Sequence, residues 1–300
     1  MPTWTAELAV DADLARRLIG GQFPGLDVSS VERTGAGWDN SVWSVEGRWF
    51  FRFPQRAAAV AGVERELAVL PGLAGRLPLA IPVPRFVGRP AAGYPWPFFG
   101  GRLIPGREIA AADLTATARG RLARPLGRFL RVLHALGGPE LERLPIDPIG
   151  RADMARRVPA TRMRLAELER LGLWRAPDRV AGMLAAARGR GPAAAVGLVH
   201  GDLHVRHLLV GADGTPTGVI DWGDVCRGDP AIDLSLYWSL FEGAGRAAFL
   251  DEYGPVAEGP LLVARVLALF LNASLAVYAH DEAMGALERV ALAGLERTVG

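Results

Sequence analysis

The sequence has 300 residues, of which half are hydrophobic and 22% are charged, and its formal net charge is +2. A chain of this length and apolar content can bury a large core, and interspersed charges without a basic stripe argue against a nucleic-acid-binding protein. All 34 basic residues are arginine, and a single cysteine, Cys226, excludes an intrachain disulfide and fits a reducing compartment.

The apolar segments do not predict a secreted or membrane-bound protein. Residues 1–18 include acids and lack a continuous apolar core, so they do not resemble a secretory signal. Polar residues interrupt the apolar segment at 260–279, which has only the minimum length for spanning a bilayer, so we expect a buried helix there. We therefore expect a cytoplasmic protein, monomeric or weakly dimeric, with no nucleic-acid and no membrane partner.

The first hundred residues predict short strands around one main helix. An amphipathic helix at 5–20 precedes strands at 28–33, 41–45 and 49–53, and a helix follows at 57–70. The loop at 34–40 between the first two strands contains Gly35, Gly37 and Asn40. Glycines lack a Cβ, so such a loop allows backbone N–H groups to approach a phosphate closely.

The middle and end of the chain predict a mainly helical region. A proline-rich extended connector at 77–84 leads to a strand at 85–87 and then to a strand and linker at 91–106. A helix is expected at 111–136, with Asp113 as its N-cap and Pro125 bending or dividing it. Further helices are expected at 149–171, 178–188, 245–253, 260–280 and 282–299.

The most informative stretch is residues 198–222. Its short apolar runs indicate strand ends, and Asp213-Gly214 is typical of a tight β-hairpin turn. The hairpin fixes Asp202 before its first strand and Asp221 after its second. Two carboxylates held this way, with His207 between them in sequence, suit a site that binds a divalent cation and deprotonates a hydroxyl.

These residues also carry a family resemblance. The segments HGDLH at 200–204, His207, IDW at 220–222 and GDPAIDL at 228–234 resemble the signature of the aminoglycoside phosphotransferase (APH) and choline kinase-like family, small-molecule relatives of the protein kinases. The resemblance implies an α+β, bilobal protein-kinase-like fold. A small β-rich N-lobe with one main helix would span residues 1–100 and bind nucleotide, and a large, mostly helical C-lobe would span 101–300 and hold catalytic and acceptor-binding residues.

The resemblance also implies roles for residues on the central stretch. Asp202 corresponds to the catalytic base, and Asp221 to the principal Mg²⁺ ligand. His207 stands where most members have an asparagine, and we expect it to ligate the metal directly or through water. Asp233 is expected to be a structural acid that caps or tethers a loop.

Nucleotide-binding residues are implied in the first hundred positions. Arg52 takes the place of the strand lysine that grips ATP or GTP phosphates, paired with Glu66 or alternatively Glu64. The glycine loop would cover the phosphates. Backbone near the lobe linker would bind the base, with candidates at Phe99, Gly101 and Leu103.

The predicted function is an O-phosphotransferase that uses ATP or GTP with Mg²⁺ on a hydroxylated small molecule. Histidine at position 207 resembles the macrolide phosphotransferase branch, so an antibiotic of macrolide or aminoglycoside type is the expected acceptor. A metabolite kinase acting on an amino alcohol, amino acid or sugar, and a catalytically weak pseudokinase, remain alternatives. A zinc hydrolase is a third, because His200, Asp202, His204 and His207 form the pattern HxDxHxxH.

Overall fold

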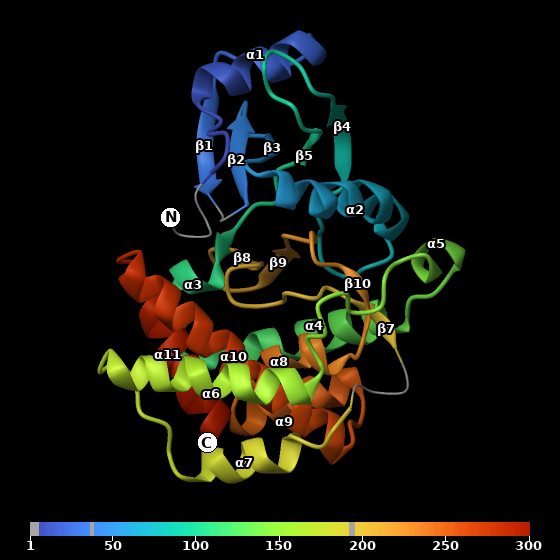
Figure 1. Cartoon of the computed structure of the whole chain (residues 1–300). Helices are drawn as coiled ribbons and strands as arrows, with labels where there is room; N and C mark the ends of the chain where they lie inside the picture. Colours follow the sequence, from blue (N-terminus) through green and yellow to red (C-terminus); the bar gives the residue numbers. More distant parts are fainter. Residues whose placement is uncertain (1–5, 37–38, 192–195) are drawn as a thin grey trace. The chain divides into compact units, whose positions relative to one another are not determined.

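The computed structural model describes residues 6–36, 39–191 and 196–300. The chain divides into two compact units, coloured along the sequence in Figure 1. Unit 1 consists of Met1–Arg76, Ala80–Ile104 and Ile220–Asp224, and unit 2 of Leu77–Leu79, Pro105–Val219 and Val225–Gly300. A five-residue segment from late in the chain therefore belongs to the unit built by the first hundred residues.

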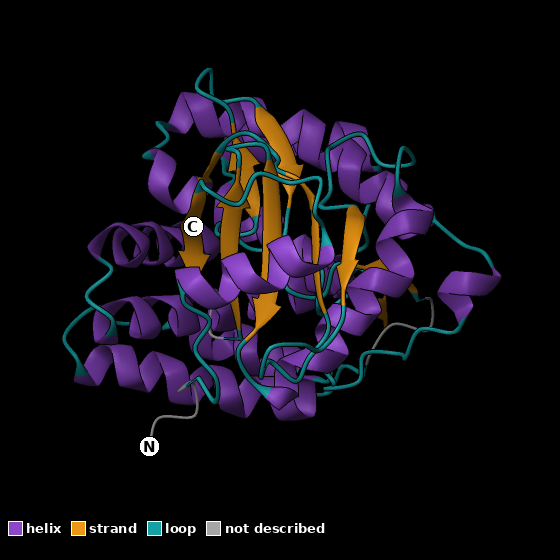
Figure 2. Cartoon of the chain, turned by 90° about the horizontal axis from the view of Figure 1, so that it is seen from above, coloured by secondary structure: helices purple, strands orange, loops and turns teal. Residues whose placement is uncertain are grey.

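Unit 1 is built on an antiparallel sheet with strand order β1-β2-β3-β5-β4 (Figures 1 and 2). Two helices, α1 and α2, complete it. The elements are β1 (Val31–Ala36), β2 (Asn40–Val45), β3 (Trp49–Pro54), β4 (Pro84–Gly88), β5 (Phe98–Arg102), α1 (Ala12–Gln22) and α2 (Ala57–Leu73). This mixed architecture with a small antiparallel sheet confirms the predicted fold class.

The side chains of β3 alternate between the two faces of the sheet, as strand geometry requires. Trp49, Phe51 and Phe53 are buried in one apolar cluster, which also contains residues of α1. Phe50 belongs to a second cluster with Val63 of α2. Arg52 has the same parity as Phe50, so strand periodicity turns its side chain toward α2.

Unit 2 is mainly helical, with α10 at its centre. Helix α10 packs against α6, α8 and α11, while α4 packs against α9. The helices are α3 (Ile109–Ala112), α4 (Ala116–Ala135), α5 (Pro139–Glu142), α6 (Met154–Arg170), α7 (Arg179–Ala187), α8 (Ala231–Leu240), α9 (Gly243–Tyr253), α10 (Glu258–Asp281) and α11 (Gly285–Val299).

Two small sheets in unit 2 flank the loop at residues 200–207. One has the strand order β6-β8-β9 and the other pairs β10 with β7, all antiparallel. Their bounds are β6 (Arg107–Glu108), β7 (Gly197–Val199), β8 (Leu208–Val210), β9 (Pro216–Val219) and β10 (Cys226–Gly228). Gly214 has φ +75° in the β8–β9 turn, which confirms the predicted hairpin. Strand β10 was not predicted, because three residues are too short to show a period.

Helix α4 differs from the prediction in two respects. It runs without a break through Pro125, and its N-cap is Thr115, whose hydroxyl accepts a hydrogen bond from the N–H of Ala118. Asp113 instead has φ 45° and follows the end of α3. A proline inside a helix costs about 3 kcal/mol, because a backbone hydrogen bond is lost and the ring crowds the preceding turn. Burial of the apolar face of α4, including Leu122 and Leu126, can offset this cost.

Helix α10 is long and apolar enough to cross a membrane by length and composition alone. However, 61% of its most apolar window is buried within the protein. Its packing against α6, α7, α8 and α11 matches the expectation of a core helix.

Candidate functional site

The loop between β7 and β8 holds the first group of predicted site residues and is tied to helix α8. Asp233 of α8 accepts hydrogen bonds from the N–H of His200 (2.7 Å) and of Gly201 (3.0 Å). His134 Nε2 lies 3.2 Å from the same carboxylate. Gly201 has φ +89°, a conformation that favours glycine. The predicted loop-tethering role of Asp233 is thus confirmed.

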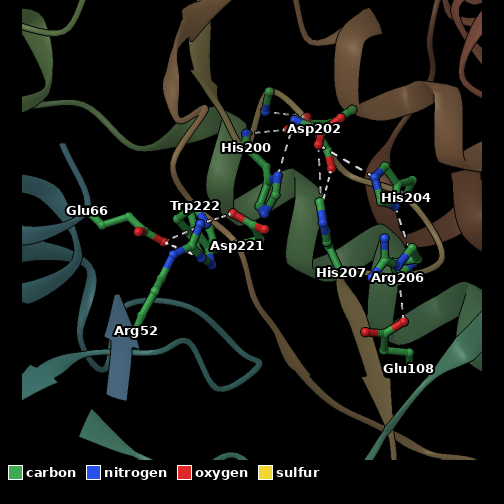
Figure 3. A network of polar contacts seen from close by, with 12 residues as sticks. Arg52, Glu66, Glu108, His200, Asp202, His204, Arg206, His207, Asp221 and Trp222 are labelled. Atoms are coloured by element: carbon green, nitrogen blue, oxygen red, sulfur yellow. Dashed lines mark hydrogen bonds and ion pairs between the residues drawn. The ribbon is translucent and has the colours of Figure 1, made fainter. Parts of the chain in front are cut away.

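Asp202 lies among three imidazole rings of its own loop (Figure 3). His204 Nε2 is 3.5 Å from Asp202 Oδ2, and His207 Nδ1 is 3.8 Å from the same oxygen. The main chain of Asp202 is held as well, because its N–H donates to His200 Nδ1 (3.3 Å) and its carbonyl oxygen accepts from His207 Nδ1 (2.7 Å). The rings of His204 and His207 stack with centroids 3.9 Å apart.

These surroundings keep the Asp202 carboxylate ionised. Burial by itself would raise its pKa, but charge and hydrogen bonding from His204, together with charge from His207 and His200, hold the pKa below its usual range. The side chain retains 35% exposure, so another molecule can reach it. Asp202 can therefore act as an accessible hydrogen-bond acceptor that is ionised at neutral pH.

The second group of predicted residues lies in unit 1 around Arg52 (Figure 3). Arg52 Nη1 is 3.4 Å from Glu66 Oε1, and Arg52 Nη2 donates to Asp221 Oδ1 at 2.6 Å. The N–H of Trp222 donates to Glu66 Oε1 at 2.9 Å. Glu66 of α2 thus contacts both the strand arginine and the segment that carries Asp221, whereas Glu64 is exposed.

The Glu66 carboxyl group is fully buried, and its environment changes its pKa. Burial raises the pKa to about 7, against the lowering effect of the Arg52 charge and the Trp222 N–H, while the Asp221 charge raises it further. Asp221 itself has φ 63°, a strained conformation for a residue with a side chain. Such strain is common where a side chain must point in one functional direction.

Two buried polar atoms of this group have no hydrogen-bond partner in the part of the chain that the structure describes. They are Glu66 Oε2 and Arg52 Nε. Buried polar groups are nearly always satisfied, so unsatisfied ones indicate a place for a polar ligand or ion. The combination of a cationic guanidinium, carboxylates and spare polar atoms fits phosphate groups with a divalent cation.

The remaining predicted nucleotide-binding residues lie on or beside the sheet of unit 1. Gly35 is at the irregular end of β1, Asn40 begins β2, and Gly37 is outside the described residues. Phe99 is fully buried against Phe50, with ring centroids 5.7 Å apart. Gly101 also pairs with Phe50, and a Cβ there would overlap the main-chain oxygen of Val83.

Leu103 lies just after β5. Its N–H donates to the carbonyl oxygen of Arg48 at 2.8 Å, and its side chain packs on the cluster that contains Phe99. Since Phe99 is buried and Gly101 has no side chain, any contact of these three positions with a ligand would rely mainly on the main chain.

Two contacts that position the Asp221 segment were not predicted from the sequence. Arg65 of α2 donates through Nη1 to the main-chain oxygen of Gly223. Gly62, one turn earlier, lies against Gly223, and a Cβ on Gly62 would be 3.4 Å from the Gly223 Cα. Glycines at positions 62 and 223 were the available signal, but a close approach between residues so far apart in sequence cannot be recognised from either alone.

The structure therefore brings the predicted residues together in two sets. Arg52, Glu66 and Asp221 meet in unit 1, and Asp202 and His207 meet in unit 2, together with His204. The first set can hold anionic groups and a cation, while the second presents an ionised carboxylate.

Comparisons with known proteins identify the family of the chain. The profile of the phosphotransferase enzyme family (APH) matches residues 30–265. The chain belongs to this phosphotransferase family. As an APH-family member it is a kinase that transfers phosphate to an alcohol group.

Solved structures of APH proteins share the fold. The GDP and kanamycin complex of APH(2")-IIia is 23% identical, with 95% of this chain and 98% of that chain covered and a TM-score of 0.69. Macrolide 2'-phosphotransferase MphH from Brachybacterium faecium is 22% identical, with coverage of 95% and 98% and a TM-score of 0.57. The uncharacterized protein YcbJ of Bacillus subtilis is 44% identical over 62 residues, which are 21% of this chain and 20% of that protein.

Proposed function

We propose that this APH-family member transfers the γ-phosphate of ATP or GTP to a hydroxyl group of a small molecule, with Mg²⁺ as cofactor. The observation that carries the proposal is the ionised, accessible Asp202 carboxylate held by a tethered loop. Structures of related folds hold GDP with kanamycin in one case and ATP with streptomycin in another, which supports a nucleotide and an antibiotic-like acceptor.

Asp202 would accept the proton of the acceptor hydroxyl. A carboxylate with a lowered pKa is a weak base, so its main contribution is to orient the hydroxyl by a hydrogen bond and to take the proton late. This suits phosphoryl transfer, in which positioning and charge stabilisation matter more than strong base catalysis.

The residues of unit 1 would bind the nucleotide. Arg52 offers a guanidinium to the phosphate oxygens, and Glu66 keeps that guanidinium on the α2 side of the sheet. The loop that contains Gly35, Gly37 and Asn40 would supply backbone N–H groups, and the main chain at Phe99, Gly101 and Leu103 would meet the base.

Asp221, whose side chain is 38% exposed, would hold the Mg²⁺ ion, and His207 is its second candidate ligand. The fit is good for Asp221, since Mg²⁺ prefers oxygen ligands, and less usual for an imidazole. When bound, the ion would neutralise negative charge on the phosphate oxygens.

The acceptor is proposed to be an antibiotic of the macrolide or aminoglycoside type. Support comes from the solved relatives, which include macrolide and aminoglycoside phosphotransferases, and from the histidine at position 207.

A nucleotide-consumption assay tests the proposal. Macrolides, aminoglycosides and hydroxylated metabolites would be offered with ATP or GTP and Mg²⁺, to the wild-type protein and to Asp202→Asn. We expect acceptor-dependent turnover that falls by about 100-fold or more in the variant, as for loss of a general base.

The outcomes separate the candidate functions. Turnover only with metabolites would contradict the proposal of an antibiotic acceptor but would support the proposed kinase activity. Nucleotide binding without turnover for any acceptor would instead favour a binding protein, and Asp202→Asn with wild-type turnover would remove Asp202 from its role.

A further inference from the structure

The catalytic loop contains a second arrangement that phosphoryl transfer does not require. In the described residues, Asp202, His204 and His207 each present one ligand atom, and these atoms all lie within 4.8 Å of one another. We propose that these three side chains bind a transition-metal ion, Zn²⁺ in particular, and that binding switches phosphotransfer off.

The spacing of the three side chains is close to what zinc requires. Zinc in a tetrahedral site has bonds of about 2.0–2.1 Å, so neighbouring ligand atoms are about 3.4 Å apart. The Asp202 carboxylate oxygen is 3.5 Å from His204 Nε2 and 3.8 Å from His207 Nδ1. The two imidazole nitrogens lie within 4.8 Å of each other, and their stacked rings, with centroids 3.9 Å apart, would have to turn apart by about 1 Å for both nitrogens to point at one ion.

The ligand types favour zinc over magnesium. Two imidazole nitrogens and one carboxylate suit zinc and its neighbours in the first transition row, whereas Mg²⁺ prefers oxygen atoms alone. Three protein ligands leave a fourth position for water, and the carboxylate is the most exposed of the three side chains, at 35% against 12% and 13% for the two imidazoles.

The surrounding main chain already fixes both rings. His204 Nδ1 accepts from the N–H of Arg206 at 3.3 Å, and His207 Nδ1 donates to the Asp202 carbonyl oxygen. In neutral rings this assigns the proton to Nε2 of His204 and to Nδ1 of His207. Zinc binding at His204 Nε2 and His207 Nδ1 would move each proton to the other nitrogen of its ring and would break both of these hydrogen bonds, so the two rings must turn to accept the ion.

Zinc at this place would block the proposed reaction. A carboxylate oxygen bonded to zinc no longer accepts a proton from an acceptor hydroxyl, and His207 becomes unavailable to Mg²⁺. Inhibition should therefore persist at saturating nucleotide. This inhibitory effect rests on the function proposed above, whereas the binding itself does not.

The binding test uses the full chain after removal of metals by a chelator. Calorimetric titration with Zn²⁺, and visible absorption of bound Co²⁺ as a tetrahedral probe, would be compared for wild type, His204→Gln, His207→Asn and Asp202→Asn. His280→Gln is the matched control, because His280 lies 2.9 Å from Glu288 on α11, outside the loop. Circular dichroism checks that each variant is folded.

We expect one tightly bound ion per chain in wild type and His280→Gln, and at least tenfold weaker binding in each loop variant. Zinc affinity in the loop variants equal to that of wild type, or no binding to the folded wild type, would overturn the site.

The inhibition test adds Zn²⁺ to the Mg²⁺-dependent transfer reaction. We expect turnover to fall and to recover with a zinc-selective chelator. Stimulation by zinc, or zinc-dependent hydrolysis, would contradict the inhibitory effect. A protein that binds zinc at this loop but never transfers phosphate would instead refute the proposed function and leave the metal site intact.

Discussion

Arg52 contacts two carboxylates through two different amino groups, Nη1 to Glu66 and Nη2 to Asp221. A guanidinium can do this because its donors are fixed in a planar fork, whereas the lysine ammonium is a single compact charge. The arginine at this position therefore links the main helix of unit 1 to the segment that carries the proposed metal ligand.

Replacing Arg52 by lysine should lower kcat/KM for phosphotransfer by about 10- to 100-fold, because one ammonium cannot keep both contacts and also bind phosphate. Steady-state kinetics with the best acceptor would measure the effect. Arg48→Lys, an exposed position on the turn before β3, is the control and should leave kcat/KM unchanged. Equal rates for Arg52→Lys and wild type would show that the fork is not needed.

Glu66 should make stability depend on pH. Its pKa is about 7 in the folded protein against 4.5 for an exposed carboxyl, so the folded state holds this proton more tightly than the unfolded state does. The contribution is complete below pH 4.5 and is lost as the pH rises to about 7, lowering the free energy of unfolding by up to about 3 kcal/mol.

Urea unfolding of wild type and Glu66→Gln across this pH range would measure that contribution, and the variant should show a flatter profile. Glu64→Gln, on the exposed side of the same helix, is the matched control and should follow wild type. A Glu66→Gln profile as steep as that of wild type would assign the pH dependence to other groups.

Among the elements, those with a clear period could be predicted from the sequence. The strands at 41–45 and 49–53 and the helix at 57–70 were found because apolar residues recur at the spacing of each structure. Helix α4 shows the limit of local rules. It continues through Pro125 because tertiary packing stabilises it, and its N-cap is Thr115, two residues after the expected Asp113. The hydrogen bond from Arg65 to Gly223 could not be predicted, because the sequence around either residue does not show which distant segment packs against it.

Close packing of α4 on α9 depends on Gly127. A Cβ at this position would overlap the main-chain oxygen of Phe249, so Gly127→Ala should reduce the free energy of unfolding by about 1–3 kcal/mol. Gly120 lies on the same helix with nothing within 4 Å of an added Cβ, so Gly120→Ala should raise stability by about 0.5–1 kcal/mol.

Chemical denaturation of the two alanine variants would measure both effects. A lower free energy of unfolding for Gly127→Ala and a higher one for Gly120→Ala would support the packing argument. A Gly127→Ala protein more stable than wild type would mean that α9 can move away from α4 without a loss of stability.

At the scale of the whole molecule, the signature between 200 and 234 was sufficient to predict the kinase-like fold and the family. The sequence did not indicate that residues 220–224 belong to the unit formed by the first hundred residues. It also left Glu64 and Glu66 as alternatives, because the choice depends on how α2 is rotated against the sheet. The roles assigned to the site residues stay predictions until the variants are measured.

Nucleotide with Mg²⁺ should stabilise the folded protein against heat. A ligand at about 100 times its dissociation constant adds about 2.7 kcal/mol, so Tm should rise with ATP or GTP and fall back when the metal is chelated. Thermal unfolding followed by fluorescence would measure the shift. Asp202→Asn should retain it and Arg52→Ala should lose most of it, and the reverse pattern would contradict the nucleotide-binding role of unit 1.

The arginine at position 52, in a chain without any lysine, also decides which chemical reagents can report on this enzyme. Acyl-phosphate analogues of nucleotides label kinases by acylating an ε-amine near the phosphates, and a guanidinium is too weak a nucleophile for that reaction. Such probes should therefore fail to label this protein in a mixture in which other kinases are labelled. Arginine-directed dicarbonyl reagents should modify it, and bound nucleotide should protect Arg52 from them.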